Sequence, residues 1–157
     1  MTDRAFVPDD FAVPPEMVTP RFRLEPLGPP HNPDDHAAWS SSIEHIRATP
    51  GFESRTWPPA GGMALEANLA DLQQHADDFA RRTGFTYSVV EPAGGGVIGC
   101  VYIYPSSRAD VDAEVRSWVR ADRAELDAHL HRAVSAWLAA VWPFGTVDYA
   151  LRLGPDA

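Results

Sequence analysis

Hydrophobic and polar positions along the chain change several times between alternation, with a period of two, and the spacing of an amphipathic helix. Alternating or continuous apolar runs predict strands over 22–27, 85–90, 97–104, 111–119 and 146–152. Apolar residues that recur every three or four positions predict helices over 32–49, 65–84 and 126–141. This order is typical of an α+β domain whose mixed, mostly antiparallel sheet is flanked by helices.

The first predicted helix has a clear start. Asn32 is the expected N-cap, because Pro33 suits the first turn and the two acidic residues that follow suit the positive end of the helix dipole. Nothing in the pattern interrupts this helix before Thr49, so we expect it to be continuous up to that residue.

Proline sets the N-terminal segment apart from the rest. Residues 1–19 are rich in Pro and Asp, which leaves little room for a helix or a central strand, and predicts an irregular arm. Its Phe6, Phe11 and Met17 are expected to pack either on the domain or on a partner. The length of 157 residues suits one domain, which we assign to residues 20–157.

Composition and charge exclude several classes of protein. Thirteen basic residues, all of them arginine, against 22 acidic residues give a formal net charge of −9, which disfavours nucleic acids and anionic membranes. The single cysteine cannot form an internal disulfide, and the N-terminus lacks the apolar run of a signal peptide. We therefore expect a cytoplasmic protein. The histidines lack paired metal-ligand spacing, so no metal site is expected.

Three segments, in order, resemble the GNAT superfamily of acyl-CoA-dependent N-acyltransferases. Residues 20–27 (PRFRLEPL) are similar to the opening strand of that family, and residues 85–101 are similar to its central hairpin. Residues 113–119 (AEVRSWV) resemble the strand A-E-[IV]-G-Y-W-[IL] of the branch that acetylates the N-termini of ribosomal proteins. The resemblance extends over about residues 20–152 and identifies a divergent, GNAT-like domain.

This resemblance implies the transfer of an acetyl group from acetyl-CoA to a primary amine, on a small molecule or at a protein N-terminus. The backbone of Val119 would pair with the pantetheine arm. The turn and helix start after that strand would hold the phosphates. The residues implied there are Arg120, Arg123, Ala124, Glu125 and Leu126.

Two residues are candidates for proton transfer. Glu114 lies on the strand where some GNAT members carry the base that accepts the amine proton. Its alternative role is that of an exposed carboxylate facing Arg116. Tyr149 is a candidate proton donor, and its alternative role is packing, because tyrosine is common in strands.

The loop over residues 50–62 carries the candidate acceptor-binding residues Phe52, Arg55 and Trp57. A loop of this length inside a compact domain is often functional. These side chains match the loop that covers the acceptor site in GNAT proteins. They suit a hydrophobic plug equally well.

Two departures from the GNAT pattern leave a second function open. The segment after residues 113–119 lacks both glycines of the family's phosphate turn, and Asp122 with Glu125 is spaced as a capping box that would occupy the free amides. The chain also lacks the C-terminal helix and two strands that follow in a complete GNAT protein. The alternative is a catalytically inactive GNAT-derived domain, with a degenerate coenzyme A site, that binds a small molecule or a protein. A homodimer, or the arm, would cover the sheet edge left at 146–152.

Overall fold

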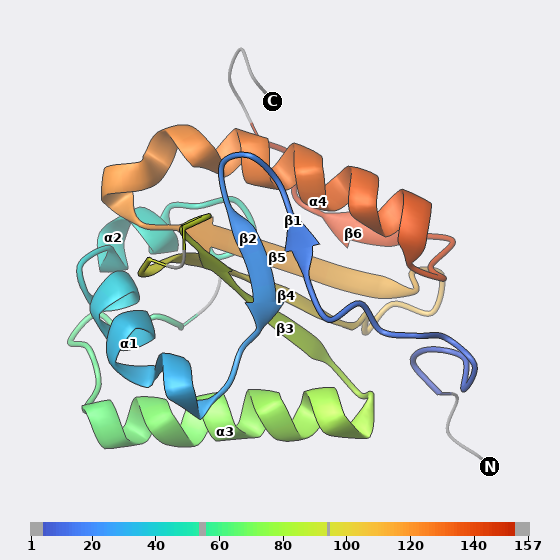
Figure 1. The fold of residues 1–157 in the computed structure, drawn as a ribbon, viewed down its shortest axis with the longest axis horizontal. Coiled ribbons are helices and arrows are strands. Elements are labelled where there is room, and N and C mark those ends of the chain that lie inside the picture. The colour runs from blue at the N-terminus through green and yellow to red at the C-terminus, as the bar shows by residue number, and fades with distance from the viewer. Residues whose placement is uncertain (1–4, 54–55, 94, 153–157) are drawn as a thin grey trace.

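The computed structural model describes residues 5–53, 56–93 and 95–152. Within them, one six-stranded sheet has the order β1-β2-β3-β4-β5-β6. Neighbouring strands are antiparallel except β5 and β6, which are parallel (Figure 1). The strands are β1 (Met17–Val18), β2 (Arg23–Pro26), β3 (Phe85–Val90), β4 (Val97–Pro105), β5 (Ala113–Val119) and β6 (Val147–Tyr149).

Helices cover both faces of this sheet, with α1, α2 and α3 on one face and α4 on the other (Figure 1). The predicted α+β architecture, with its mostly antiparallel sheet, is therefore confirmed. Within the described residues, no helix has both the length and the apolar character needed to cross a membrane. The helices are α1 (Asn32–Ser40), α2 (Ile43–Arg47), α3 (Leu65–Arg81) and α4 (Asp127–Val141), and 3-10 turns span Pro29–His31 and Ala121–Leu126.

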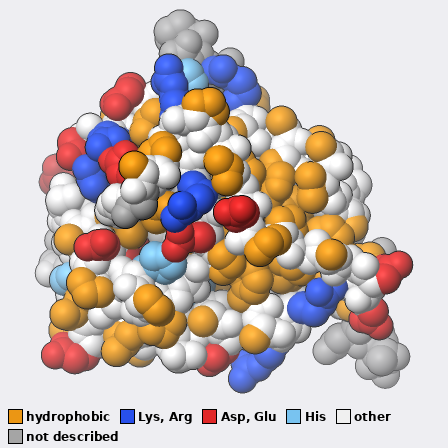
Figure 2. All heavy atoms as spheres, in the orientation of Figure 1, with side chains coloured by type: hydrophobic (Ala, Val, Ile, Leu, Met, Phe, Trp, Pro, Cys, Tyr) orange, Lys and Arg blue, Asp and Glu red, His pale blue; other side chains and the backbone are white. Residues whose placement is uncertain are grey.

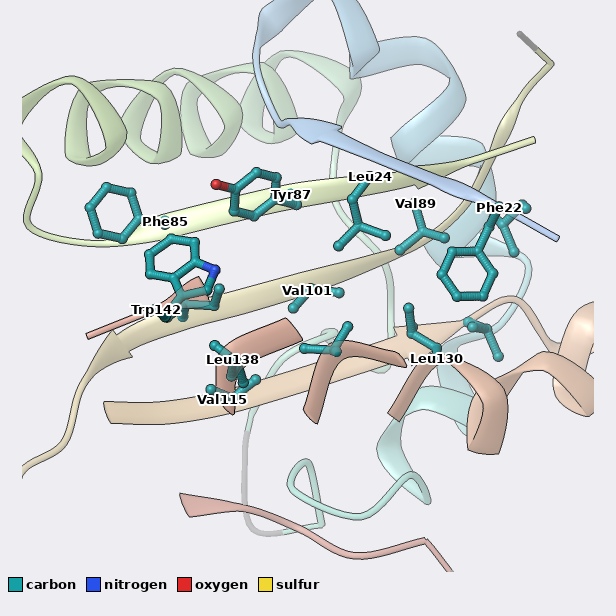
Figure 3. Packing of buried hydrophobic residues seen from close by; sticks show 14 of the residues in the cluster. Phe22, Leu24, Phe85, Tyr87, Val89, Val101, Val115, Leu130, Leu138 and Trp142 are labelled. Atoms are coloured by element: carbon teal, nitrogen blue, oxygen red, sulfur yellow. The ribbon is translucent and has the colours of Figure 1, made fainter. Parts of the chain in front are cut away.

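One apolar stripe holds α4 to the sheet. Leu130, Val134 and Leu138 recur every fourth residue and are buried. Figure 3 shows Leu130 and Leu138 on the side of the sheet where Val101 of β4 and Val115 of β5 lie, and all belong to one packed cluster. Full burial of such a side chain contributes about 1.5–3 kcal/mol. The apolar residues whose helical spacing predicted a helix over 126–141 are thus the residues that pack on the sheet.

The first helix is not continuous as predicted, because the chain turns at two serines. The hydroxyl of Ser41 donates to the carbonyl of Ala38, and the hydroxyl of Ser42 accepts the backbone N–H of Ala121. Serine side chains that bond to backbone in this way compete with the helical ladder. As a result α1 ends at Ser40 and α2 starts at Ile43. Asn32 is not the N-cap but the first residue of α1, after the 3-10 turn.

The described part of the N-terminal arm packs on the domain. Phe6 stacks between Phe85 and Phe144, with ring centroids 5.8 Å and 5.0 Å away, and Phe11 lies 5.2 Å from Trp142. Figure 2 shows apolar side chains gathered where the arm meets the end of α4. The prediction of a wholly irregular arm was wrong, since its last residues form β1. β1 pairs with β2, at the edge of the sheet opposite β6, so this strand of the arm does not cover the edge at 146–152 as one alternative expected. A homodimer through β6 stays a prediction.

Gly99 of β4 allows the closest approach between β4 and β5. A Cβ at this position would lie 2.1 Å from the carbonyl oxygen of Trp118. We expect Gly99→Ala to lower the free energy of unfolding by about 2–3 kcal/mol, because the two strands must move apart. Urea denaturation measures this. Gly96→Ala, in the same hairpin with nothing within 4 Å of a Cβ, is the control, and an equal loss in both variants would contradict the argument.

Candidate functional site

A chamber of about 520 Å³ opens between α3 and the face of the sheet that α1 to α3 cover. Its apolar end is formed by Phe52, Trp57 and Tyr102, and its polar end includes His75 and Asp78 of α3. The two predicted substrate residues Phe52 and Trp57 therefore line one cavity. The third, Arg55, lies outside the described residues.

The aromatic end of the chamber is a packed group of rings around Trp57. The ring centroid of Trp57 lies 6.2 Å from the centroids of Phe52, Tyr102 and Trp118, and 5.6 Å from that of Trp39. The indole N–H of Trp118 donates to the Tyr102 hydroxyl over 3.0 Å. Phe52 and Trp118 are buried in this group, whereas Trp57 and Tyr102 are partly exposed.

The polar end is organised by a histidine network. The Tyr104 hydroxyl donates to Asp78 over 2.9 Å. Nδ1 of His75 lies 2.9 Å from the Tyr104 oxygen and 3.1 Å from the Thr86 hydroxyl oxygen. Burial lowers the pKa of His75, against the opposing effect of Asp71 and Asp78. The ring is therefore neutral at pH 7, within a cavity that also holds carboxylates.

A glycine fixes the position of Tyr104. A Cβ on Gly84 would lie 2.0 Å from the Tyr104 ring, so the ring rests directly on the backbone at the start of β3. The helix predicted over 65–84 is shorter in the structure: α3 ends at Arg81, and Arg82 takes the left-handed conformation after it.

Carboxylates lie at two depths in the chamber. Asp35 is 4% exposed, and it accepts a hydrogen bond from the Asn68 amide over 3.1 Å. Burial raises the pKa of Asp35, and the Asn68 hydrogen bond opposes this shift. Asp71 is exposed at the mouth. The carboxyl groups of Asp71 and Asp78 make the α3 side of the chamber acidic.

The two predicted catalytic residues lie on opposite faces of the sheet. Side chains alternate along β5, so Glu114 and Arg116 face the side of α1 to α3, whereas Ser117 faces α4. Glu114 accepts a hydrogen bond from Arg116, which lines the chamber. Tyr149 instead packs on the α4 side, with its hydroxyl 2.5 Å from the Ser117 hydroxyl. The fold does not bring Glu114 and Tyr149 together.

β5 and β6 part after a short paired segment, and we call the side-chain-filled space between them, on the α4 side, the cleft. They pair only from Ala113 with Val147 to Val115 with Tyr149. β5 then continues to Val119, whereas β6 ends. The backbone of Arg120 bonds to Ile98 of β4, so the antiparallel pattern turns the N–H and C=O groups of Ser117 and Val119 away from β4. These backbone groups face the cleft.

Arg152 fills the cleft. Its guanidinium donates to the carbonyl of Ser117 over 2.9 Å, to Asp127 over 2.6 Å and to the carbonyls of Ala150 and Pro50 over 2.8 and 3.3 Å. The residue is only 5% exposed. One buried arginine thus joins β5, α4 and the loop after α2.

Further polar groups surround this arginine. The His131 ring of α4 lies 4.2 Å from that of Tyr149, and burial lowers the pKa of His131 and raises the pKa of Tyr149. Asp127 Oδ1 and His131 Nε2 are buried and have no hydrogen-bond partner among the residues that the structure describes. The cleft is therefore a polar interior of the domain.

The turn after β5 holds its arginines against carboxylates of the same chain. The Arg120 guanidinium makes two hydrogen bonds to Asp122, of 2.9 and 3.1 Å, and a third to the carbonyl of Val97. Arg123 forms an ion pair with Glu91. Both predicted phosphate-binding guanidinium groups are thus already paired.

The helix start also differs from the prediction. Residues 121–126 form a 3-10 turn without a side-chain cap, so the capping box of Asp122 and Glu125 was wrong, because Asp122 bonds to Arg120 instead. Ala124 and Glu125 are exposed on this turn, whereas Leu126 is buried in the core under α4.

The fold is similar to those of several solved acetyltransferases. One is the ribosomal-protein-S5-alanine acetyltransferase from Vibrio fischeri, at a TM-score of 0.60 and 13% identity, over 78% of this chain and 66% of that one. The chain has the GNAT fold. A second is RimL, the ribosomal L7/L12 α-N-protein acetyltransferase, in complex with coenzyme A. It has a TM-score of 0.59 and 14% identity, over 78% of this chain and 66% of that one. A third is the microcin C7 self-immunity acetyltransferase MccE, in complex with acetyl-CoA and AMP. It has a TM-score of 0.57 and 10% identity, over 78% of this chain and 66% of that one.

The likeness is one of three-dimensional structure. The sequence matches no protein-family model and no curated protein. The chain spans about two thirds of the length of the GNAT structures that it matches, 66% in each of the three above.

The GNAT fold implies coenzyme A beside Val119 and the turn that follows, and the residues present do not fit it there. A pyrophosphate needs unpaired amides and cations. Here the N–H of Ala121 bonds to Ser42, and Arg120 and Arg123 are paired with carboxylates. The pantetheine arm needs the edge of β5 that Arg152 already occupies.

Sequence reasoning missed the polar end of the chamber. Asp71, His75 and Asp78 are spaced i, i+4 and i+7, so they share one face of α3 beside the apolar stripe. That spacing was the available signal. Arg152 had no comparable signal, because its partners come from three distant segments. Among the described residues, no group of three or more His, Cys, Asp or Glu is arranged to hold a metal ion.

We expect the ring of His75 to titrate below the ordinary value of about 6.5. The unfolded chain then binds more protons, so the contribution of His75 reduces the free energy of unfolding as pH falls below about 6.5. NMR titration of the ring carbons, assigned with His75→Gln, measures the pKa directly. A value at or above 6.5 would contradict the burial argument.

Arg152→Met should lower the free energy of unfolding by about 3 kcal/mol, because it leaves the Asp127 carboxylate without its cation. Adding Asp127→Asn should recover part of this loss. Arg108→Met is the control, since its contact with Asp148 is 3.7 Å long and exposed, and should change stability by less than about 0.5 kcal/mol. Equal losses in both arginine variants, measured by urea denaturation, would mean that Arg152 is not a structural centre.

Proposed function

We propose that this GNAT-fold domain binds a small molecule in the chamber between α3 and the sheet, and does not transfer acetyl groups from coenzyme A. The observation that carries the proposal is the Arg152 guanidinium between β5 and β6, bonded to the Ser117 carbonyl on the strand edge that a pantetheine arm would need. The pairing of Arg120 and Arg123 with carboxylates supports the same conclusion.

The chamber has the features of a ligand site. Its volume of about 520 Å³ falls within the usual range for small-molecule pockets. One end offers the faces of aromatic rings, which supply apolar contact area, and the other offers a small number of positioned polar groups. Its walls are the sheet, α3 and the loop after α2, so the ligand surface does not depend on the cleft being open.

The second candidate is an N-acetyltransferase that acts on a primary amine or a protein N-terminus. The GNAT fold favours it, since the similar structures named above are acetyltransferases, two of them acting on ribosomal proteins. In that case Glu114 and Tyr149 would be the candidates for proton transfer. Arg152 and the paired arginines of the turn would then have to move before the cofactor could bind.

Titration calorimetry with acetyl-CoA at about millimolar concentration separates the two functions. We expect no saturable heat from the wild type, and no release of coenzyme A thiol when amines are added. The reason is that a phosphate would have to displace Asp122 and Glu91 from their arginines.

The contrary outcome is equally specific. Saturable binding that is abolished by Arg123→Glu, but kept in Arg81→Glu, would overturn the proposal and support the acetyltransferase. Arg81 is the matched control because it is an exposed arginine at the end of α3.

A further inference from the structure

The N-terminal arm docks on an aromatic surface that the end of α3, the start of β3 and the end of α4 build together. The ring of Trp142 lies 5.2 Å from Phe11 of the arm, between ring centroids. It also lies 5.2 Å from Phe85 and 5.7 Å from Phe144. Figure 3 shows Phe85, Tyr87 and Trp142 together on the α4 side of the sheet. We call Arg82, Phe85, Tyr87, Trp142 and Phe144 the arm-docking surface.

Hydrogen bonds from this surface go to main-chain carbonyls of the arm. The guanidinium of Arg82 donates to the carbonyls of Pro8 and Phe11, over 2.7 and 2.9 Å. The hydroxyl of Tyr87 donates to the carbonyl of Pro14 over 2.7 Å. Aromatic surfaces recognise extended, proline-rich peptides, and main-chain hydrogen bonds add affinity whatever the peptide side chains are. The arm is therefore held as a bound peptide would be.

Proline restricts the shape of the arm before it docks. Val7, Val13 and Pro14 each precede a proline, which limits them to extended conformations. Such a segment loses little conformational freedom on binding. Val7 is only 2% exposed, and Phe11 packs on the core cluster, so these two side chains anchor the arm. The arm thus carries much of its bound shape in its own sequence.

One turn joins the arm to the rest of the domain. The Phe22 carbonyl accepts the Thr19 N–H over 2.9 Å, and the Thr19 hydroxyl accepts the Phe22 N–H over 3.1 Å. Pro20 and Arg21, between them, are exposed. The surface lies far along the chain from this turn, since the Arg82 side chain and the Phe11 carbonyl that it binds are 71 positions apart. With the turn opened, the arm of another copy would meet the same surface and make the same contacts.

We infer that the arm-docking surface accepts the arm of a second copy of this chain, so that two copies exchange residues 5–18. Each copy then gives its arm to the other, which is a closed, two-fold arrangement. The turn holds each arm near its own surface at an effective concentration of about millimolar, which favours the unexchanged form in dilute solution. The inference does not rest on the proposed function, because the chamber lies on the other side of the sheet.

A full-length chain with a weakened arm leaves the surface open to a peptide. The chain carries Phe6→Ser and Phe11→Ser, and the probe is a labelled peptide of residues 5–18, AFVPDDFAVPPEMV. We expect fluorescence anisotropy to show it binding about tenfold or more tightly than the same peptide with both phenylalanines replaced by serine. The reason is that the serine peptide loses the ring contacts of the arm with Phe85, Phe144 and Trp142.

Variants of the surface in the same weakened-arm chain test the hydrogen bonds. Arg82→Ala should weaken the peptide about fivefold, because the bonds to the Pro8 and Phe11 carbonyls are lost. Tyr87→Phe should also weaken it about fivefold, since it removes the hydroxyl that binds the Pro14 carbonyl. Arg81→Ala is the matched control and should leave binding unchanged, because Arg81 is exposed on the last turn of α3.

A shortened turn should force the exchange. Deletion of residues 19–21 leaves only Phe22 between β1 and β2, fewer than the two residues of the tightest hairpin loop. We expect light scattering at about 50 μM, well below the effective concentration of the tethered arm, to give this chain about twice the mass of the wild type. Three glycines in place of residues 19–21 should restore the wild-type mass, because they allow the chain to turn back.

Each outcome decides the inference. Equal binding of the two peptides, or of neither, overturns it. A deletion chain that keeps the wild-type mass also overturns it, and peptide binding in that case would assign the surface to a segment of another protein. A larger mass that Arg82→Ala and Tyr87→Phe leave unchanged indicates contact through a different surface, and again overturns it. Where the serine substitutions unfold the chain, the deletion and glycine chains decide, because their arm is intact.

Discussion

The contacts of the Arg152 guanidinium link β5, α4 and the loop after α2. Parting of β5 and β6 leaves backbone groups of β5 without a strand partner, and buried groups of that kind must be satisfied. Arg152 satisfies the Ser117 carbonyl, neutralises Asp127 and reaches the Pro50 carbonyl. The last contact holds the start of the loop that carries Phe52 and Trp57. The same guanidinium thus contacts both the β5 edge and the segment that precedes the wall of the chamber.

Alternation along β5 explains why the two faces have separate chemistry. Glu114 and Arg116 project toward the chamber, while Ser117 projects toward the cleft and bonds to Tyr149. Because the sheet lies between them, Glu114 and Tyr149 cannot act on one atom through the arrangement seen here. Any proton transfer in the chamber would instead involve groups that face it, such as His75, whose pKa is lowered by burial. Because the sheet separates the two sets of groups, a ligand can bind in the chamber without entering the cleft.

Sequence reasoning predicted those parts of the structure that local pattern determines. The apolar stripe of α4 and the run of strands β3 to β5 follow from periodicity, which depends only on near neighbours in the chain. The break at Ser42 was missed because the partner of its hydroxyl, Ala121, lies 79 residues away. The same reason applies to Arg152, whose partners become neighbours only after folding. Phe52 and Trp57 drew attention because aromatic residues in a long loop are themselves a signal, and their role as binding residues stays a prediction.

Fold and cofactor site place different demands on a sequence. The GNAT fold at 10–14% identity needs only apolar residues at the right spacing and a register that pairs Gly99 with Val119, which many sequences provide. A phosphate turn needs unpaired amides, backbone without obstructing side chains and cations without partners, and each of these costs stability when no ligand is present. Here the guanidinium groups of Arg120 and Arg123 bond to carboxylates, and the amide of Ala121 donates to the Ser42 hydroxyl. Such internal pairing stabilises the turn in the absence of a ligand, whereas the chamber is a cavity between α3 and the sheet.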